Sequence, residues 1–289
     1  MEMKDIIEVR SGEALYPPLL ATIPDAPERL FVRGDARALT AEPAIAVVGT
    51  RKFTPYGQTV TGRFVRAWAE AGIMVASGLA LGIDAIAHQT TLDAGGLTIA
   101  VLGGGVDPAT IAPRTNARLA ERIIAAGGAV VSEYPPGTPP HPGRFPERNR
   151  IVAGLVRAVI VIEGSMKSGT LITAKAALEY QRDVFAVPGP VTHESSAGAN
   201  WLITQGAYPL TRPEDVLERF GLTKPREKHR ETGVTAGLIL KELAHAPATP
   251  DRLVASTGLD TSAVLAALSE LEIQGLAARC GDEYSTVEN

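Results

Sequence analysis

The chain has 289 residues, enough for one large domain and a small one, and its 45% hydrophobic residues can bury a substantial core. Its single cysteine, Cys280, excludes a disulfide framework within the chain and a metal cluster held by thiolates. The sequence has no secretory signal and no apolar stretch long enough to span a bilayer, so we expect a cytoplasmic protein without membrane contact.

The formal net charge of −4 does not by itself point to a nucleic-acid partner. The charge is unevenly distributed, however. Residues 1–231 carry 25 basic and 24 acidic side chains, whereas residues 232–289 carry 3 and 8. The acidic character therefore belongs to the C-terminal part of the chain.

Residues 1–42 are rich in proline and predict an extended, irregular lead-in that lies over a core. Apolar runs and helical segments then alternate. The six runs that could form buried strands are 45–49, 73–78, 98–103, 129–133, 158–163 and 183–189. The main helical patterns are Gln58–Ala71, Ile83–Ala94, Arg114–Ala126 and Thr170–Tyr180. Strands buried on both faces predict a Rossmann-like α/β domain over residues 1–220, with a parallel sheet and helices on both faces.

The C-terminal part predicts a second, smaller domain. Residues 221–233 are highly charged without an apolar period, which indicates a linker. The helical patterns Thr235–Ala244, Thr249–Ser256 and Thr261–Gln274 precede a two-stranded hairpin over 276–287. This order predicts a winged-helix domain over residues 234–289.

The stretch "AIAVVGTRKFTPYG" begins like a dinucleotide-binding loop, but Arg51 stands where the second glycine of Gly-x-Gly-x-x-Gly would be. The second strand ends in Ser77 and Gly78 rather than in the acidic residue that holds a ribose. We therefore expect no dinucleotide and no other cofactor. Glycines follow five of the predicted strands, which favours a phosphate-binding edge over simple turns. They are Gly49, Gly78, Gly103–Gly105, Gly164 and Gly189.

The stretch "GRFPERNRIVAGL" gathers cations, an amide and an aromatic ring. Arg144, Arg148 and Arg150 suit phosphate oxygens, with Asn149 among them, and Phe145 could stack on an unpaired base. Two alternatives stay open. Phe145 could fill the core, and Arg150 could form an ion pair with Glu163 or Asp84.

The loop Gly164–Thr170 joins glycines, hydroxyls and Lys167 at a helix N-terminus, as an anion site requires. It lacks the Gly-Lys-[Ser/Thr] of a P-loop, so ATP hydrolysis is not indicated. The histidines have no metal-ligand spacing. Asp84 and His88 lie four apart on one helix, where an ion pair is favoured over an acid–base pair.

In this order, the motifs resemble the DNA-processing protein A (DprA) family. The matching stretches are "VVGTRKFTPYG", "SGLALGIDAIAH", "VLGGGVD", "FPERNRIVAGL", "SGTLITAKAALEYQRDVFAVPG" and "GANWLITQGA". The resemblance implies a protein that binds the phosphates of incoming single-stranded DNA, protects it and loads the recombinase RecA during natural transformation. It also implies a homodimer formed through the late part of the α/β domain.

The expected DNA site combines the strand-end turns with the residues that match the family. Its residues are Gly49, Thr50, Arg51, Lys52, Ser77, Gly78, Gly104, Arg114, Arg144, Phe145, Arg148, Asn149, Arg150, Ser165, Lys167, Ser168, Gly169 and Thr170. Two departures from the family are visible. Ala112 replaces a tyrosine that many members have. Too few residues precede Ile45 for the helical domain that many members carry there, so we expect a short form or a truncated chain.

The strongest alternative is an enzyme, because the α/β domain is also similar to the LOG-type phosphoribohydrolases. Their signature Pro-Gly-Gly-x-Gly-Thr-x-x-Glu ends in a catalytic glutamate, and that position here holds Thr173, which cannot act as an acid or base. We therefore expect no catalysis and no catalytic residue. A transcription factor would rest on the winged helix alone.

Two further expectations concern contacts. The segment "SAGANWLITQGAYPL" carries Trp201, Leu202, Ile203 and Tyr208, which could form a dimer patch or close the domain's own core. The third helix of the predicted winged-helix domain has no Lys or Arg, so we expect this domain to contact a protein rather than read DNA.

Overall fold

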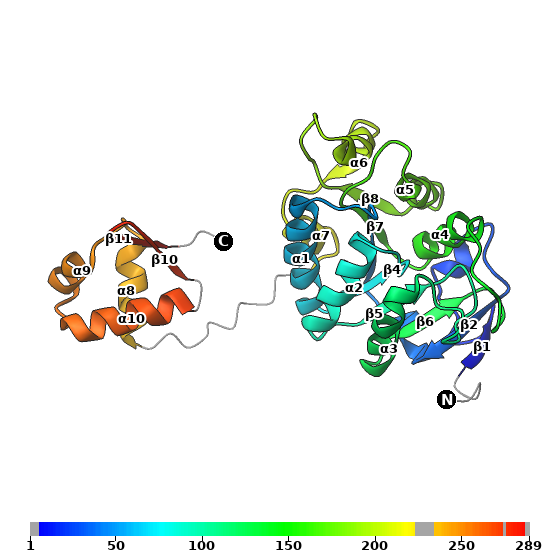
Figure 1. Cartoon of the computed structure of the whole chain (residues 1–289), viewed down its shortest axis with the longest axis horizontal. Helices are drawn as coiled ribbons and strands as arrows, with labels where there is room; N and C mark the ends of the chain where they lie inside the picture. Colours follow the sequence, from blue (N-terminus) through cyan, green and yellow to red (C-terminus); the bar gives the residue numbers. More distant parts are fainter. Residues whose placement is uncertain (1–5, 223–233, 274–275, 287–289) are drawn as a thin grey trace. The chain divides into compact units, whose positions relative to one another are not determined.

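The computed structural model describes residues 6–222, 234–273 and 276–286. The chain divides into two compact units, one up to Lys224 and one from Pro225 (Figure 1). Of the linker predicted over 221–233, residues 223–233 lie outside the described residues.

The larger unit is built on a nine-stranded sheet of order β1-β2-β6-β5-β4-β3-β7-β8-β9. The strands are β1 (Ile6–Arg10), β2 (Arg29–Gly34), β3 (Ala44–Val48), β4 (Met74–Ser77), β5 (Thr98–Val101), β6 (Ala129–Ser132), β7 (Ala158–Val161), β8 (Asp183–Ala186) and β9 (Tyr208–Pro209). The strands from β6 to β9 along this order are parallel to their neighbours. The predicted Rossmann-like sheet is therefore confirmed, and each of the six predicted strands forms.

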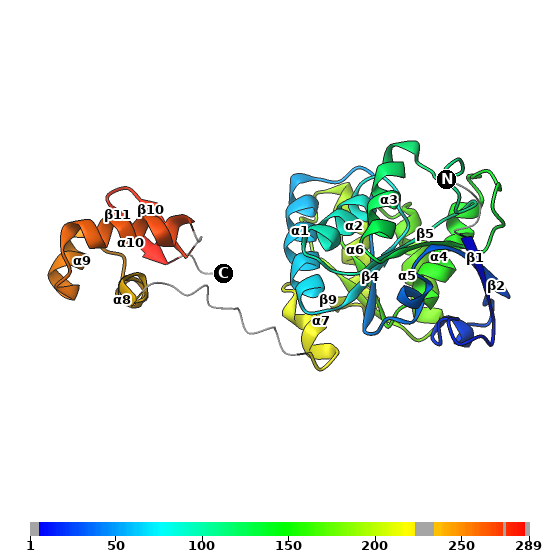
Figure 2. The same ribbon diagram turned by 90° about the horizontal axis from the view of Figure 1, so that it is seen from below.

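Helices cover both faces of the sheet (Figures 1 and 2). On one face lie α1 (Pro55–Glu70), α2 (Ile83–Asp93), α3 (Ala117–Ala125) and α7 (Glu214–Arg219). On the other lie α4 (Arg144–Gly154), α5 (Gly169–Glu179) and α6 (Glu194–Thr204). Alternate residues of a strand serve the two layers: Ile45 packs with Trp68, whereas Ala46 packs with Ile151 on the opposite face. Strands buried on both faces explain why their sequences are apolar throughout.

The N-terminal lead-in is ordered, so the expectation of an irregular segment was wrong. It contains β1, β2 and the short 3-10 helices η2 (Leu20–Thr22) and η3 (Ala36–Thr40). β2 pairs antiparallel with β6, and β1 pairs antiparallel with β2. The expected cover over the core does form, because Leu20 and Ile23 pack against Gly154 of α4.

The chain reverses its direction of strand addition at β3. From β3 the sheet grows through β4 to β6 on one side, and through β7 to β9 on the other. The loops after β3 and β7 therefore leave the same edge in opposite directions. In open α/β sheets the crevice at such a point, beyond the carboxyl ends of the strands, is where ligands bind.

The smaller unit has the predicted winged-helix order. It comprises α8 (Val234–Leu243), α9 (Pro250–Thr257), α10 (Thr261–Ile273), β10 (Ala277–Cys280) and β11 (Glu283–Thr286). Its core includes Ile239, Leu253 and Leu268, and Tyr284 of the hairpin pairs with Ala248 before α9. Within the described part of the chain, no helix combines the length and hydropathy needed to cross a bilayer.

Candidate nucleic-acid interface

A cavity of about 520 Å³ opens at the switch point between β3 and β7. We call it the strand-edge pocket. Four segments line it: the turn after β3, the start of α2, α4, and the loop that leads into α5. Its lining residues are Val48, Gly49, Thr50, Arg51, Ala80, Asp84, Pro142, Phe145, Pro146, Arg148, Asn149, Ser165, Ser168, Gly169, Thr170 and Thr173.

The guanidinium of Arg148 forms the floor of the strand-edge pocket. This side chain is only 4% exposed and donates to the backbone oxygen of Val101 at the end of β5. Its Nε has no hydrogen-bond partner among the described residues. Burial lowers the pKa of Arg148 to about 10, which still leaves it charged at pH 7, and the nearby Asp84 carboxylate counteracts part of that shift. A fixed positive charge therefore lies beneath the cavity.

Two glycines make room for the Arg148 side chain and for the close approach of α2 to the turn after β3. A Cβ on Gly78 would collide with the guanidinium of Arg148, so only glycine fits there. Gly82 has φ +84° and lets the N-terminus of α2 approach the turn after β3, where Ile83 N donates to Thr50 O at 3.2 Å. Between these glycines, Leu79 has φ +57°, a strained conformation for a leucine.

Asn116 holds that strained segment in place. Its amide Nδ2 donates to the backbone oxygens of Leu79 at 2.9 Å and Ala80 at 3.2 Å. Asn116 itself is only 9% exposed. These two hydrogen bonds fix the loop after β4, whose Ala80 lines the strand-edge pocket.

The turn after β3 brings a guanidinium over an aromatic ring. Arg51 is exposed, and its Cζ lies 5.8 Å from the centroid of the Phe145 ring. Phe145 is half-buried, lines the pocket and does not belong to any of the core clusters. The alternative that Phe145 fills the core is therefore wrong.

The loop before α5 forms the opposite wall. Ser168 is the N-cap of α5, where its Oγ accepts from Thr170 N at 3.2 Å and lies 2.8 Å from Thr170 Oγ1. Asn149 Nδ2 donates to Gly169 O at 3.3 Å and joins α4 to this loop. Ser165 also lines the pocket. Hydroxyls and a helix N-terminus therefore face the cavity, as an anion site requires.

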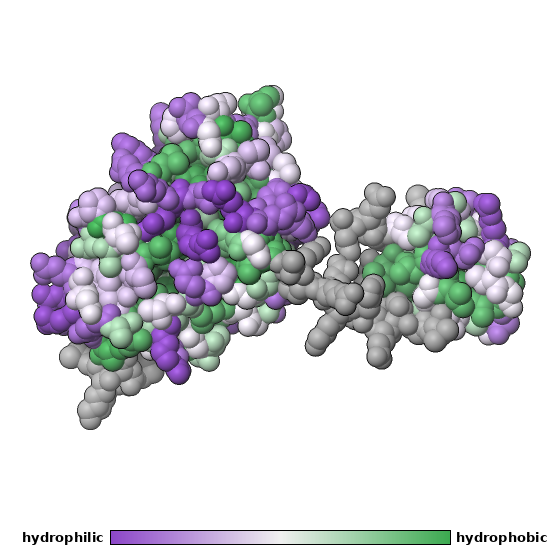
Figure 3. All heavy atoms as spheres, turned by 180° about the vertical axis from the view of Figure 1, so that it is seen from behind, coloured by the Kyte–Doolittle hydropathy of each residue, from purple (hydrophilic) through white to green (hydrophobic). Residues whose placement is uncertain are grey.

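Three cations of the expected site are exposed and have no ion-pair partner among the residues that the structure describes. They are Arg51, Lys52 and Lys167. On the face of the larger unit seen in Figure 3, strongly hydrophilic residues adjoin hydrophobic ones in the hollowed middle of that face. Only Arg51 of the three also lines the strand-edge pocket.

The remaining arginines have partners within the protein. Arg150 forms an ion pair with Glu133 at 2.5 Å and lies 3.6 Å from Asp25. The alternative of an ion pair within the protein therefore holds for Arg150, but its partners are Glu133 and Asp25 rather than Glu163 or Asp84. Arg144 lies 4.7 Å from the Tyr134 ring centroid and donates to Pro139 O.

Several other expected site residues also have structural contacts. Arg114 donates to the backbone oxygens of Pro108 and Ala109. Ser77 is fully buried and donates to Val47 O at 2.6 Å, so the structure gives it no access to a ligand. Gly104 packs against the segment around Pro140.

Asp84 and His88 do not form the expected ion pair. His88 is fully buried, and its Nδ1 lies 2.7 Å from Thr98 Oγ1. Burial, aided by the charge of Arg148, lowers the pKa of His88 to about 3, so the ring is neutral at pH 7. Asp84 instead accepts from Gly78 N at 3.1 Å, and burial raises its pKa while Arg148 opposes that effect. Asp84 and His88 therefore do not form an acid–base pair, because each is hydrogen-bonded to another residue.

Sequence reasoning missed the prolines and Asp84 in the pocket wall. Pro142 and Pro146 line the cavity on both sides of Phe145. The sequence signal was the position of these two prolines on either side of Phe145 in "HPGRFPERNR", because each proline restricts its own backbone φ angle. No group of His, Cys, Asp and Glu suited to a metal ion occurs among the described residues.

Comparison with known proteins decides the family. The model of the family "DNA recombination-mediator protein A" matches residues 8–221, and that of the "DprA winged helix domain" matches residues 224–283. The chain belongs to the DprA family.

Among curated DprA relatives, the chain is 47% identical over 216 residues to protein Smf of Escherichia coli, covering 74% of this chain and 57% of that protein. It is 43% identical over 205 residues to DNA processing protein DprA of Bacillus subtilis, covering 71% of this chain and 68% of that protein. The chain thus spans little more than half of the Escherichia coli protein.

A solved DprA structure has the same fold. The X-ray structure of DNA processing protein A from Streptococcus pneumoniae matches with a TM-score of 0.69 and 41% identity, over 75% of each chain. A structure of DNA processing protein A from Helicobacter pylori matches with a TM-score of 0.66 and 30% identity, over 74% of this chain and 95% of that one. The latter is described as giving insight into that protein's single-stranded DNA binding mode.

The neutral state of His88 predicts a pH dependence of stability. The pKa of His88 is about 3 in the folded chain and about 6.5 in an unfolded one. The stability that this difference contributes is present above pH 6.5 and is lost as the pH falls toward 3. Between pH 7 and 5, His88 should lower the free energy of unfolding by about 1–2 kcal/mol.

Urea unfolding of the wild type and of His88→Gln at several pH values measures this contribution, because the variant should lack it. In NMR spectra, the His88 ring should not titrate above pH 5. A His88 ring that titrates between pH 6 and 7 would contradict the assignment.

Proposed function

We propose that this chain binds single-stranded DNA through backbone phosphates held in the strand-edge pocket. The observation that carries this proposal is the arrangement around Arg148: a buried guanidinium beneath a cavity whose rim carries Arg51 without an ion-pair partner in the described chain. A guanidinium fork suits phosphate oxygens, and the α5 N-terminus adds hydrogen-bond donors for an anion.

The Phe145 ring favours a single strand over a duplex. It is half-buried at the pocket wall, and base stacking on an aromatic ring requires an unpaired base. The described binding of single-stranded DNA by the Helicobacter pylori relative supports the same assignment. We further propose that the role is protection of incoming DNA in natural transformation, in the cytoplasm, as the family resemblance implies.

The phosphoribohydrolase is the weaker candidate. In the position of that family's catalytic glutamate stands Thr173, which is 2% exposed at the wall of the pocket. A hydroxyl of this kind does not titrate near pH 7 and cannot act as the acid or base of glycosidic cleavage. We therefore propose that the pocket binds phosphate without hydrolysing a nucleotide. Release of a free base from a nucleoside monophosphate would contradict this.

The first prediction of the proposal concerns Arg51→Glu. This change should weaken binding to an unstructured oligonucleotide by roughly 10- to 150-fold, because it removes a charged hydrogen bond worth about 1.5–3 kcal/mol and adds repulsion. The slope of log affinity against log salt should become shallower by about 0.7 for the lost phosphate contact. Fluorescence anisotropy over a salt series, with single- and double-stranded oligonucleotides, measures both effects.

Arg63→Glu is the matched control, since it makes the same charge change at an exposed position of α1 outside the pocket. It should bind almost as well as the wild type. Equal affinity of Arg51→Glu and the wild type, with both folded, would rule out the strand-edge site.

We also propose that the protein loads RecA, which rests on the family resemblance alone. RecA assembly on single-stranded DNA covered by a single-strand-binding protein should be faster in the presence of this chain. Arg51→Glu should abolish that acceleration, because the chain must hold the strand to deliver it. The DNA-dependent ATPase of RecA provides the measurement, and an unchanged lag would contradict this role.

A homodimer through the late part of the α/β unit is a further proposal. Trp201 of α6 and Tyr208 of the edge strand β9 are 42% and 43% exposed, which supports a contact surface. Leu202 is buried in the core, and Ile203 packs partly against it, so these two close the monomer instead. The dimer patch predicted from sequence therefore reduces to its two aromatic residues.

Light scattering at micromolar concentration should give twice the chain mass for the wild type. Trp201→Glu should give the mass of one chain, because a charge would be buried without a partner at the interface. Ile7→Glu, equally exposed on β1 at the other end of the sheet, is the control and should leave the mass unchanged. A wild type with the mass of one chain would exclude the dimer.

We propose that the winged-helix unit contacts a protein rather than DNA. Its helix α10 has no Lys or Arg and carries Glu270 and Glu272. A recognition helix needs cations to approach phosphates, so this surface would repel a duplex. Deletion of residues 232–289 should leave single-strand affinity unchanged or slightly higher in the same anisotropy assay. A large loss of affinity on deletion would contradict the charge argument.

A further inference from the structure

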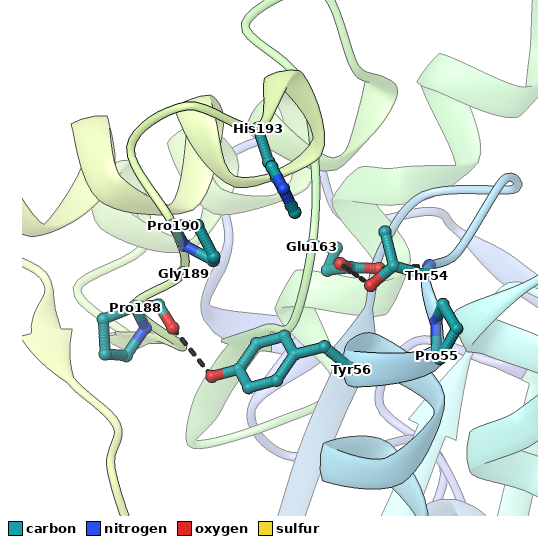
Figure 4. Close-up of a pocket in the computed structure, with 8 residues that line it drawn as sticks. All are labelled: Thr54, Pro55, Tyr56, Glu163, Pro188, Gly189, Pro190 and His193. Atoms are coloured by element: carbon teal, nitrogen blue, oxygen red, sulfur yellow. Dashed lines mark hydrogen bonds between the residues drawn. The ribbon is translucent and has the colours of Figure 1, made fainter.

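A second cleft of about 480 Å³ lies beside the strand-edge pocket. We call it the Tyr56 cleft. Its walls are the N-terminus of α1 and the loop between β8 and α6 (Figure 4). The turn after β3 serves both cavities: Gly49 to Arg51 line the strand-edge pocket, and Thr54 lines the Tyr56 cleft.

The first wall is fixed by a carboxylate. Glu163, just after β7, is 2% exposed and accepts two hydrogen bonds from Thr54, at 2.6 Å from its Oγ1 and at 3.0 Å from its backbone nitrogen. Thr54 in turn caps α1 by accepting from Gly57 N. The first turn of α1, which carries Tyr56, is thereby anchored to the sheet.

The second wall is fixed by the backbone. Asn200 of α6 exchanges two hydrogen bonds with Gly189, of 3.1 Å and 2.9 Å. Gly164 N donates to Ser195 O at 2.7 Å and ties the start of α6 to the end of β7. Across the cleft, the Tyr56 hydroxyl donates to Pro188 O at 2.8 Å. Both walls are therefore held in place, as in a preformed binding site.

The chemistry of the Tyr56 cleft suits a planar, uncharged group. The Tyr56 side chain is 44% exposed, and Figure 4 shows its ring and that of His193 entering the cleft from opposite sides. Three of the remaining lining residues are prolines, which offer apolar surface without an N–H donor. None of the described residues that line the cleft is a Lys or an Arg, and the Glu163 carboxylate would repel a phosphate.

We propose that the Tyr56 cleft takes an unpaired nucleobase of the strand whose phosphates lie in the strand-edge pocket, stacked on the Tyr56 ring opposite His193. This inference rests on the proposed function. The two cavities meet at one turn, and Phe53 of that turn is itself 41% exposed. A strand leaving Arg51 along this turn passes directly from cations to aromatic rings, which is the usual composition of a single-strand groove.

Tyr56→Ala tests the inference in the full-length chain. Loss of one stacked base should weaken binding to an oligonucleotide by roughly 5- to 150-fold. Tyr56→Phe should bind like the wild type, because it keeps the ring and loses only the hydrogen bond to Pro188. Tyr180→Ala is the matched control: Tyr180 is also a partly exposed tyrosine with a bonded hydroxyl, at the far end of α5 from the pocket.

Oligonucleotides with a single abasic site, moved along the strand, give a second measurement that needs no variant. The wild type should lose affinity when the missing base is the one that enters the cleft. In Tyr56→Ala, that position should no longer matter. Free 2-aminopurine nucleotide and a 2-aminopurine oligonucleotide distinguish the source of the base: quenching by the wild type at micromolar concentration is expected for the oligonucleotide alone.

The outcomes separate the two proposals. If the wild type binds no oligonucleotide, the proposed function fails, and this inference fails with it. If the wild type binds and Arg51→Glu does not, while Tyr56→Ala binds equally well with an unchanged abasic profile, only the Tyr56 cleft is overturned. Quenching by the free nucleotide at the same concentration would also overturn it, since the cleft would then be a mononucleotide site.

Discussion

The architecture of the larger unit depends on burying one positive charge at the carboxyl edge of its sheet. The guanidinium of Arg148 meets the end of β5 at Val101, and the carboxylate of Asp84 on α2 lies near enough to oppose its loss of charge. Desolvating a guanidinium is costly, so its surroundings must supply compensation. Gly78 leaves room for it, and the strained loop after β4 passes around it. Helices α2 and α4, on opposite faces of the sheet, are joined electrostatically through this one side chain.

The basic residues around the strand-edge pocket fall into two groups, those with partners inside the protein and those exposed to solvent. Arg148 donates to Val101 O and Arg150 pairs with Glu133 inside the protein, whereas Arg51 and Lys167 remain exposed without an ion pair in the described chain. A buried cation such as Arg148 sets the shape and the electrostatic potential of the cavity that it lines. Exposed ones are available to a mobile polyanion and lose their influence as salt increases. A site with both kinds can hold a flexible chain in one place while its outer contacts exchange.

The strands and the positions of the cations were predictable from sequence. The strand that pairs with β2 and the residues that pair with the arginines were not. Apolar runs buried on both faces identify β3 to β8 because every residue in them contributes to one layer or the other. Helix α4 gave no such signal, since its first seven residues include three arginines and Pro146. The antiparallel pairing of β2 with β6 joins two segments that are far apart in the chain, which no local pattern encodes. Arg150 could not be matched to Glu133, 17 residues away, nor Arg148 to Val101, 47 residues away, without the fold.

The two ends of the sheet differ in a way that limits how the protein can associate. At one end, β1 is five residues long, and its apolar Ile7 and Val9 alternate with the charged Glu8 and Arg10. At the other, β9 has two residues, and one of them is Pro209, which has no backbone N–H to donate. Open edges of regular sheets can recruit further strands without limit and so lead to fibrous aggregates. An edge as short as β9 offers too little backbone for such growth, so that association there must depend on side chains and can stop at a defined size.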